Sequence, residues 1–146
     1  KEREGLTFVH PFDDEDVISG AGTIGLEMLE DAPQLEMIVV PVGGGGLISG
    51  IAVAARALKN DIEIIGVQTR MFPSMHAELA GKEPSAQCGG QTIAEGIAAK
   101  QVALASRLSK IWSRKSCLSM KMILNRRLLC FATSKKRSQK AQVRLA

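Results

Sequence analysis

The chain has 146 residues, of which 45% are hydrophobic, and a formal net charge of +4. This composition is typical of one soluble globular domain rather than of a disordered protein. No apolar run approaches the roughly 18 to 20 residues that span a membrane, and the first residues form no apolar signal segment. We therefore expect a cytoplasmic protein or a fragment of one, with no membrane partner.

The net charge conceals a division of the chain near residue 100. Residues 1–100 carry 7 basic and all 15 acidic side chains, whereas residues 101–146 carry 12 basic side chains and no acidic ones. All 14 glycines and all 5 prolines also precede residue 101. Because these residue types mark turns and the ends of helices, the two segments are interpreted separately.

The first third of the chain predicts a short strand and a helix. Leu6–Val9 is a β-type run, which is followed by the acidic turn HPFDDED. A helix is expected from about Gly22 to Glu30, and Pro33 helps to end it.

The next segment predicts a βαβ unit. Leu35–Val42 is an almost uninterrupted apolar run, the pattern of a strand buried on both faces. Leu47–Lys59 has the apolar spacing of a helix, and Ile62–Val67 predicts a second buried strand. A helix of this length between two strands predicts an α/β fold: part of a parallel sheet with right-handed crossovers and helices on both faces.

Four consecutive glycines lie between the first buried strand and the helix: Gly43, Gly44, Gly45 and Gly46. Without Cβ atoms, successive backbone N–H groups can turn toward one phosphate, and the helix dipole adds about half a positive charge there. The alternatives are a tight turn or a flexible linker, but the apolar flanks VVPV and LISGIAVAA argue against a linker. The loop lacks the Lys-Ser/Thr of a P-loop and the spacing GxGxxG, so a nucleotide is the weaker choice of ligand.

Four segments, in this order, resemble threonine dehydratases: VHPFDDEDVISGAGTIGLEMLED, VVPVGGGGLISGIA, IIGVQTRMFPSMHAEL and GGQTIAEGIAAK. They cover about residues 5–100. The resemblance implies the tryptophan synthase β fold, fold type II among pyridoxal-phosphate enzymes, which serine racemase shares. It also implies that backbone amides hold the phosphate of pyridoxal 5′-phosphate, here those of Gly43 to Gly46 and of Leu47. The substrate would be a small amino acid, and intact relatives would form homo-oligomers.

One segment departs from the family pattern, and one acidic position is retained. The family segment GQGT is here Gly20-Ala21-Gly22-Thr23, so a glutamine contact is lost while the backbone turn is expected to survive. Glu95 matches an acidic position that lines the active site of related enzymes; a helix-capping or solvated carboxylate is the other interpretation.

A metal site is not expected. Gln68 occupies the place of the glutamate through which some relatives bind a divalent cation. The cysteines are odd in number and lack paired metal spacing, which predicts free thiols: Cys88, Cys117 and Cys130.

The lysine to which the family attaches its cofactor is not found in this chain. The resemblance places it upstream, in a motif of the SFKxRGA type, and the asparagine loop around the cofactor ring is also absent. The polar residue that faces the pyridine nitrogen is expected well beyond residue 100. Lys1 and Lys59 have the context of ordinary surface lysines. Residues 1–100 therefore predict a partial catalytic domain that is inactive alone and folds incompletely or aggregates.

The tail, residues 101–146, is open to three interpretations. Its basic residues could form a nucleic-acid arm, and Met120–Leu129 is amphipathic enough for a membrane-surface helix. The third interpretation is translation in a shifted frame, which removes acidic, glycine and proline residues together. With permitted synonymous codons, Met120–Leu128 becomes DEDDIEQAV and Lys135–Ala146 becomes EKTVAEGAGAAG, both family segments. The interpretation as a shifted frame is favoured, with the shift between about Ala99 and Val102. It implies an irregular or helical tail that has no selected fold. It also implies that the chain has no nucleic-acid partner.

The leading hypothesis from the sequence is a threonine ammonia-lyase that converts threonine to 2-oxobutanoate and ammonia. A serine racemase or serine dehydratase is the alternative within the same fold, because the glycine loop recognises a phosphate and not the substrate side chain. A non-catalytic module that binds a phosphorylated ligand is the alternative from another class.

Overall fold

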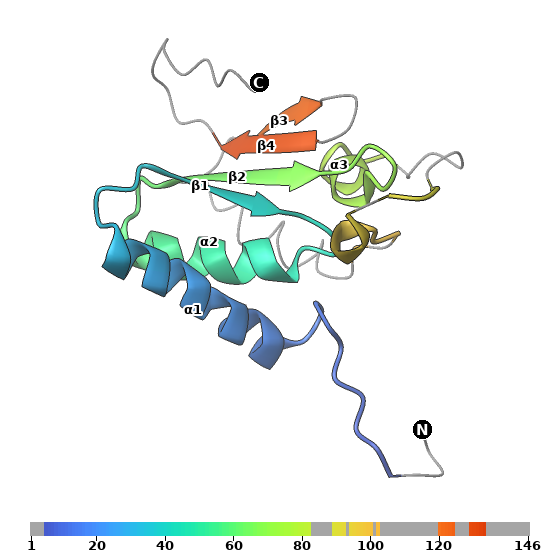
Figure 1. Ribbon diagram of the computed structural model, residues 1–146, viewed down its shortest axis with the longest axis horizontal. Coiled ribbons are helices and arrows are strands. Elements are labelled where there is room, and N and C mark those ends of the chain that lie inside the picture. The colour runs from blue at the N-terminus through green and yellow to red at the C-terminus, as the bar shows by residue number, and fades with distance from the viewer. Residues whose placement is uncertain are drawn as a thin grey trace.

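The structure is a computed structural model that describes residues 5–82, 89–92, 94–100, 102, 120–124 and 129–133. Helices and strands alternate along the first part of the chain, as predicted (Figure 1). In chain order the elements are α1 (Glu15–Asp31), β1 (Met37–Pro41), α2 (Gly46–Leu58), β2 (Glu63–Gln68), α3 (Ser74–Leu79), a 3-10 turn (Glu95–Ile97), β3 (Met120–Leu124) and β4 (Leu129–Thr133).

Helix α1 begins earlier than the sequence predicted. Asp14 is its N-cap, and one oxygen of the Asp14 carboxylate accepts hydrogen bonds from the backbone N–H groups of Asp16 (2.9 Å) and Val17 (3.1 Å). The acidic turn thus supplies the cap, and GAGT lies inside the helix, so the expected backbone turn there is wrong. Leu6–Val9 is not a strand either, because no described strand pairs with it.

Replacement of the N-cap should weaken α1. We expect Asp14→Ala to lower the free energy of unfolding by about 1 kcal/mol, since two backbone donors lose their acceptor. Asp13→Ala removes the same charge from the neighbouring exposed position and is the matched control. Urea unfolding followed by circular dichroism measures both; equal losses in the two variants would contradict the capping role.

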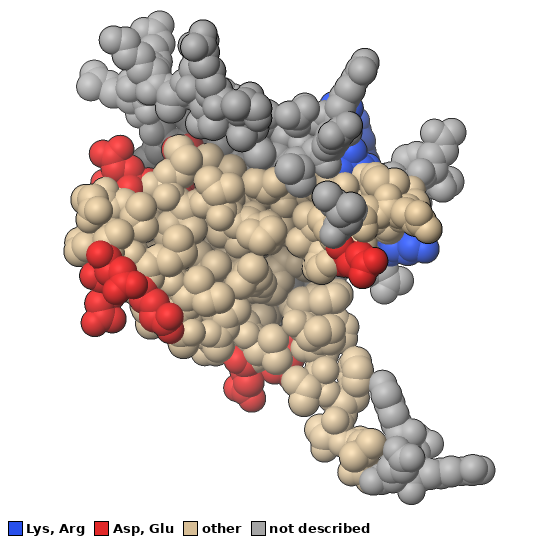
Figure 2. All heavy atoms as spheres, in the orientation of Figure 1, with Lys and Arg blue, Asp and Glu red and all other residues tan. Residues whose placement is uncertain are grey.

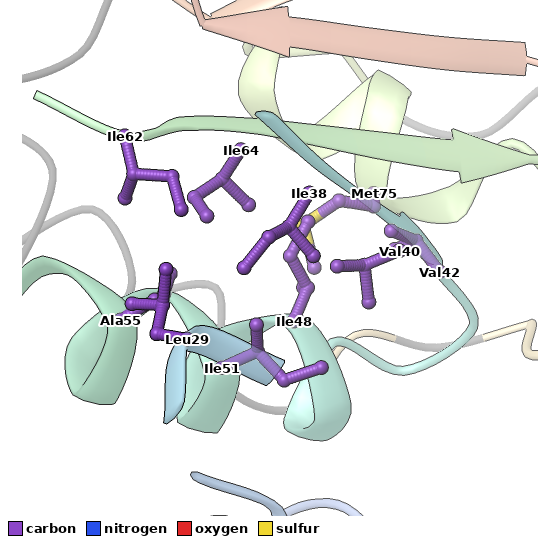
Figure 3. Packing of buried hydrophobic residues seen from close by; sticks show 11 residues of the cluster. Leu29, Ile38, Val40, Val42, Ile48, Ile51, Ala55, Ile62, Ile64 and Met75 are labelled. Atoms are coloured by element: carbon purple, nitrogen blue, oxygen red, sulfur yellow. The ribbon is translucent and has the colours of Figure 1, made fainter. Parts of the chain in front are cut away.

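Strands β1 and β2 form the predicted parallel pair, with Val39 opposite Ile65. Buried residues alternate along both strands, and α2 packs its apolar face against them. Figure 3 shows the side chains of β1, α2 and β2 converging between the sheet and the helix. The core contains Leu29, Ile38, Val40, Val42, Ile48, Ile51, Ala52, Ala55, Ile62, Ile64 and Met75.

The described helices α1 and α2 lie on the same side of the sheet (Figure 1). Helix α2 lies between α1 and the two strands β1 and β2. On the opposite face of β1 the Val39 side chain is 56% exposed. Acidic side chains gather near both ends of α1 on the face seen in Figure 2. The α/β class and the parallel strands are therefore as predicted, and none of the described helices is long and apolar enough to cross a membrane.

Helices α1 and α2 approach so closely that three glycine positions leave little room for a Cβ atom, and least at Gly50. A Cβ atom on Gly22 would lie 3.2 Å from the carbonyl oxygen of Gly50, and one on Gly25 would lie 3.0 Å from that of Ile51. A Cβ atom on Gly50 would collide with the carbonyl oxygen of Ile18 and lie 2.7 Å from the amide nitrogen of Gly22. The glycine spacing in GAGTIG thus serves helix packing.

The tail differs from the predicted irregular or helical structure. Strands β3 and β4 pair antiparallel, and β4 pairs antiparallel with β2, which gives the sheet order β1-β2-β4-β3. The physical reason is that without β4 the second edge of β2 would leave its backbone groups unpaired, and an extended segment can add to such an edge. The remainder of residues 103–146 lies outside the described residues.

Candidate functional site

The four glycines lie where the sequence placed them, between β1 and α2. The amide of Val42 donates to the carbonyl oxygen of Val67 at 2.7 Å, so strand pairing continues to the residue before the loop. Gly45 has a φ of 102° and is the N-cap of α2, with no side-chain capping bond and no acidic residue in the first turn. Such a φ favours glycine.

Five consecutive backbone amides, those of Gly44 to Ile48, donate no hydrogen bond within the part of the chain that the structure describes. The first amides of any helix lack intrahelical acceptors, and the helix dipole places positive charge among them. An anion therefore fits this end of α2 in charge and in hydrogen-bonding type.

Packing within the chain also restricts three of these four glycines. A Cβ atom on Gly44 would collide with the ring of Phe12, and one on Gly46 would lie 2.8 Å from the carbonyl oxygen of Phe12. A Cβ atom on Gly43 would lie 3.1 Å from the Cα of Ile97. Two distant segments of the chain thus meet the loop, which the sequence alone did not indicate.

The segment before α1 holds Phe12 in place. The Nδ1 atom of His10 accepts hydrogen bonds from the amides of Asp13 (2.9 Å) and Phe12 (3.4 Å). The His10 ring also makes edge-on contacts with Phe8 and Phe12, with ring centroids 5.8 and 4.6 Å apart. The motif FVHPF therefore forms a compact turn against the loop.

Gln68 connects the loop to α3. It is the last residue of β2 and is fully buried. Its side-chain amide nitrogen lies 3.5 Å from the carbonyl oxygen of Gly43 and 3.3 Å from the Ser74 hydroxyl, while its oxygen accepts from the His76 amide at 3.2 Å. Among the described residues no group of three or more His, Cys, Asp or Glu could hold a metal ion.

Glu95 lies beside the loop rather than within it. The Glu95 side chain is exposed and begins the 3-10 turn, whose next residues Gly96 and Ile97 approach Gly43. It lines an open hollow of about 560 Å³, with Gly90, Gln91, Thr92 and Ala98. Glu95 makes no helix-capping bond there, since Ala94 is the N-cap of the turn.

The other residues singled out in the sequence lie apart from the loop. The Lys59 ammonium donates to the carbonyl oxygens of Leu35 (2.6 Å) and Pro33 (3.3 Å), so it ties α2 to the turn before β1. Cys130 lies in β4. Outside the described residues lie Lys1, Cys88 and Cys117.

Burial lowers the pKa of His76 below its ordinary 6.5, and the positive charge of Lys82 lowers that pKa further. Below pH 6.5 the unfolded chain therefore binds more protons at this residue than the folded chain does. The resulting stability is present above pH 6.5 and is lost as the pH falls through the lowered pKa. We expect the free energy of unfolding to fall more between pH 7.5 and 5.5 in the natural chain than in His76→Gln; equal falls in a urea titration would contradict this.

A sequence model of the family described as "Pyridoxal-phosphate dependent enzyme" matches residues 1–116, which passes the predicted boundary near residue 100. The chain is 52% identical over 101 residues to the L-threonine ammonia-lyase of Thermotoga maritima, which covers 69% of this chain and 25% of that protein. It is 44% identical over 95 residues to the catabolic L-threonine dehydratase of Escherichia coli, covering 65% of this chain and 29% of that protein.

Solved structures agree with these relatives. Maize serine racemase matches with a TM-score of 0.65 and 36% identity, over 73% of this chain and 34% of the racemase. Isoform 2 of threonine deaminase from Solanum lycopersicum matches with a TM-score of 0.62 and 37% identity, over 69% and 29% of the two chains. The chain spans about a quarter of the length of the curated relatives it matches. The chain belongs to the family of pyridoxal-phosphate-dependent enzymes.

Proposed function

We propose that residues 1–100 are part of the catalytic domain of a cytoplasmic threonine ammonia-lyase, which converts L-threonine to 2-oxobutanoate and ammonia. In this proposal the backbone amides of Gly43, Gly44, Gly45, Gly46 and Leu47 hold the phosphate of pyridoxal 5′-phosphate. Residues 101–146 are proposed to be a tail translated in a shifted frame.

The observation that carries the proposal is the row of amides at the N-terminus of α2 that donate to no acceptor among the described residues. Four of them belong to the proposed phosphate contacts, and no carboxylate in the first turn of α2 opposes a dianion. The names of the similar bacterial enzymes support threonine as the substrate. Glu95 is the acidic residue among the residues that line the open hollow beside the loop.

The cofactor, when bound, would withdraw electrons from the substrate Cα and so supply the chemistry of the elimination. The residues of this chain would contribute binding and orientation: the loop amides fix the phosphate, and Phe12 packs over the loop. Lys59 is engaged with two carbonyl oxygens and does not suit covalent attachment. We therefore expect no ammonia release from L-threonine by the isolated 146-residue chain with added pyridoxal 5′-phosphate; measurable 2-oxobutanoate would contradict this.

A chimera tests the proposed function. Residues 5–100 of this chain would replace the matching segment of the Thermotoga maritima enzyme, which then supplies the lysine and the remaining domain. We expect the chimera to retain pyridoxal 5′-phosphate and to deaminate L-threonine, with Gly46→Ala in the chimera as the impaired control.

Serine racemase is the second candidate, favoured by the structural match to the maize enzyme. The same chimera separates the two, since interconversion of L-serine and D-serine without 2-oxobutanoate from threonine would favour the racemase. A chimera that folds but loses the cofactor would contradict both candidates.

A further inference from the structure

The side chain of Gln68 lies outside the glycine loop and approaches the first peptide group of the loop, at the carbonyl oxygen of Gly43. Gln68 is 0% exposed, and a buried side-chain amide needs both donors and acceptors around it. Two segments of the chain provide them: the start of the loop at Gly43, and α3 with Ser74 and His76.

The hydrogen-bond network fixes which way the Gln68 amide faces. The backbone N–H of His76 is a donor, so it must meet the amide oxygen of Gln68. The Ser74 hydroxyl has one hydrogen, which it donates to the carbonyl oxygen of Ala99 at 2.8 Å. Ser74 must therefore accept from the NH₂ group of Gln68, and that group then faces the Gly43 carbonyl as well.

The carbonyl of Gly43 and the N–H of Gly44 belong to one peptide plane and point in opposite directions. Gly43 has no side chain through which the loop could be held, and the ladder between β1 and β2 ends at Val42. A donor on the Gly43 carbonyl oxygen consequently sets the direction of the Gly44 N–H, the first of the five amides without acceptors.

We propose that Gln68 is a positioning residue for the phosphate-binding loop: it holds the Gly43 peptide so that the Gly44 amide points toward the anion. This inference rests on the proposed function of the loop. A carboxylate at position 68 could still accept from His76, but it would present an unprotonated oxygen to the carbonyl oxygen of Gly43 and to the Ser74 hydroxyl.

Two variants and one control test this in the full 146-residue chain. Gln68→Met keeps the approximate volume without hydrogen bonds, and Gln68→Glu keeps the acceptor but loses the donors. Thr69→Val is the matched control, because Thr69 is also buried and next in sequence, and its hydroxyl accepts from the Met71 amide. The readouts are ¹⁵N relaxation of the Gly44–Ile48 amides without ligand, and titration with inorganic sulfate, which stays a dianion across the pH range.

We expect both Gln68 variants at pH 8 to bind sulfate about tenfold more weakly, with order parameters of the loop amides falling from about 0.85 toward 0.6. Thr69→Val should stay within about twofold of the natural chain. As the pH falls to 5.5, the carboxyl of Gln68→Glu takes up a proton and regains one donor, so its loop order and sulfate binding should recover. Gln68→Met should not recover.

The inference would be overturned if Gln68→Met had the same loop order parameters and the same sulfate affinity as the natural chain. It would also be overturned if Gln68→Glu showed no recovery at pH 5.5 while the natural chain still bound sulfate there. If Gln68→Met fails to fold, the inference is tested by the loop order and sulfate binding of Gln68→Glu at pH 8 and at pH 5.5. If the natural chain binds no sulfate but its loop loses order in Gln68→Met, the proposed phosphate site is refuted and the structural support by Gln68 is retained.

Discussion

Gly50→Ala is expected to lower the free energy of unfolding by about 3 kcal/mol, enough to unfold much of a marginally stable chain. The added Cβ atom collides with the backbone of α1 at Ile18 and Gly22, and a backbone carbonyl cannot rotate away as a side chain can. Either α1 separates from α2 or both helices bend, and each change exposes part of the core around Leu29 and Ile51. Urea unfolding followed by circular dichroism measures the loss.

Gly20→Ala is the matched control for this prediction. Gly20 lies in the same helix pair, but a Cβ atom there meets nothing within 4 Å. Alanine at an exposed helical position stabilises by about 0.5 to 1 kcal/mol relative to glycine. The two substitutions should therefore act in opposite directions, and a Gly50→Ala chain as stable as the natural one would contradict the close approach of α1 and α2.

Gly46→Ala is expected to have the largest effect on anion binding, a loss of about tenfold to a hundredfold in affinity for pyridoxine 5′-phosphate. Its Cβ atom would lie 2.8 Å from the carbonyl oxygen and 2.9 Å from the Cα of Phe12, so the first turn of α2 must shift. Each charge-assisted contact from a displaced amide is worth roughly 1.5 to 3 kcal/mol. Amide chemical shifts during a titration give the affinity.

Two further alanine variants distinguish a loop effect from general damage. The three atoms nearest to a Cβ atom on Gly44 belong to the ring of Phe12, which can rotate, so the loss of affinity in Gly44→Ala should be smaller. Gly96→Ala adds a Cβ atom in open space beside the loop and should bind as the natural chain does. Equal affinities for Gly46→Ala and Gly96→Ala would contradict the assignment of the α2 amides.

The sequence was sufficient for the elements whose signals are local. The apolar run before the glycines and the run at Ile62–Val67 predicted β1 and β2. The expected burial of the first strand on both faces is wrong for β1, where Val39 is 56% exposed on the face that α2 does not cover. The position of the glycine loop followed from the same pattern. The predicted start of α1 is too late, although Asp14 with Glu15 and Asp16 is a helix N-terminus signal, because glycines such as those of GAGT are typical of turns.

Other features depend on contacts between distant segments and carry no local signal. Phe12 lies more than thirty residues before the loop it packs against, so this contact depends on the tertiary fold. Gln68 was interpreted only as the loss of a metal ligand, and its bonds to Gly43 and α3 required the fold. The pairing of β4 with β2 depends on an open strand edge, which no single-residue property of the tail indicates.

Titration of the natural chain with pyridoxine 5′-phosphate and with pyridoxine tests the central claim most directly, because the two compounds differ only in the phosphate. The proposed site predicts saturable shifts of the Gly44–Ile48 amide signals with pyridoxine 5′-phosphate and none with pyridoxine. Shifts of equal size with both compounds, or shifts confined to other residues, would contradict a phosphate site at the N-terminus of α2.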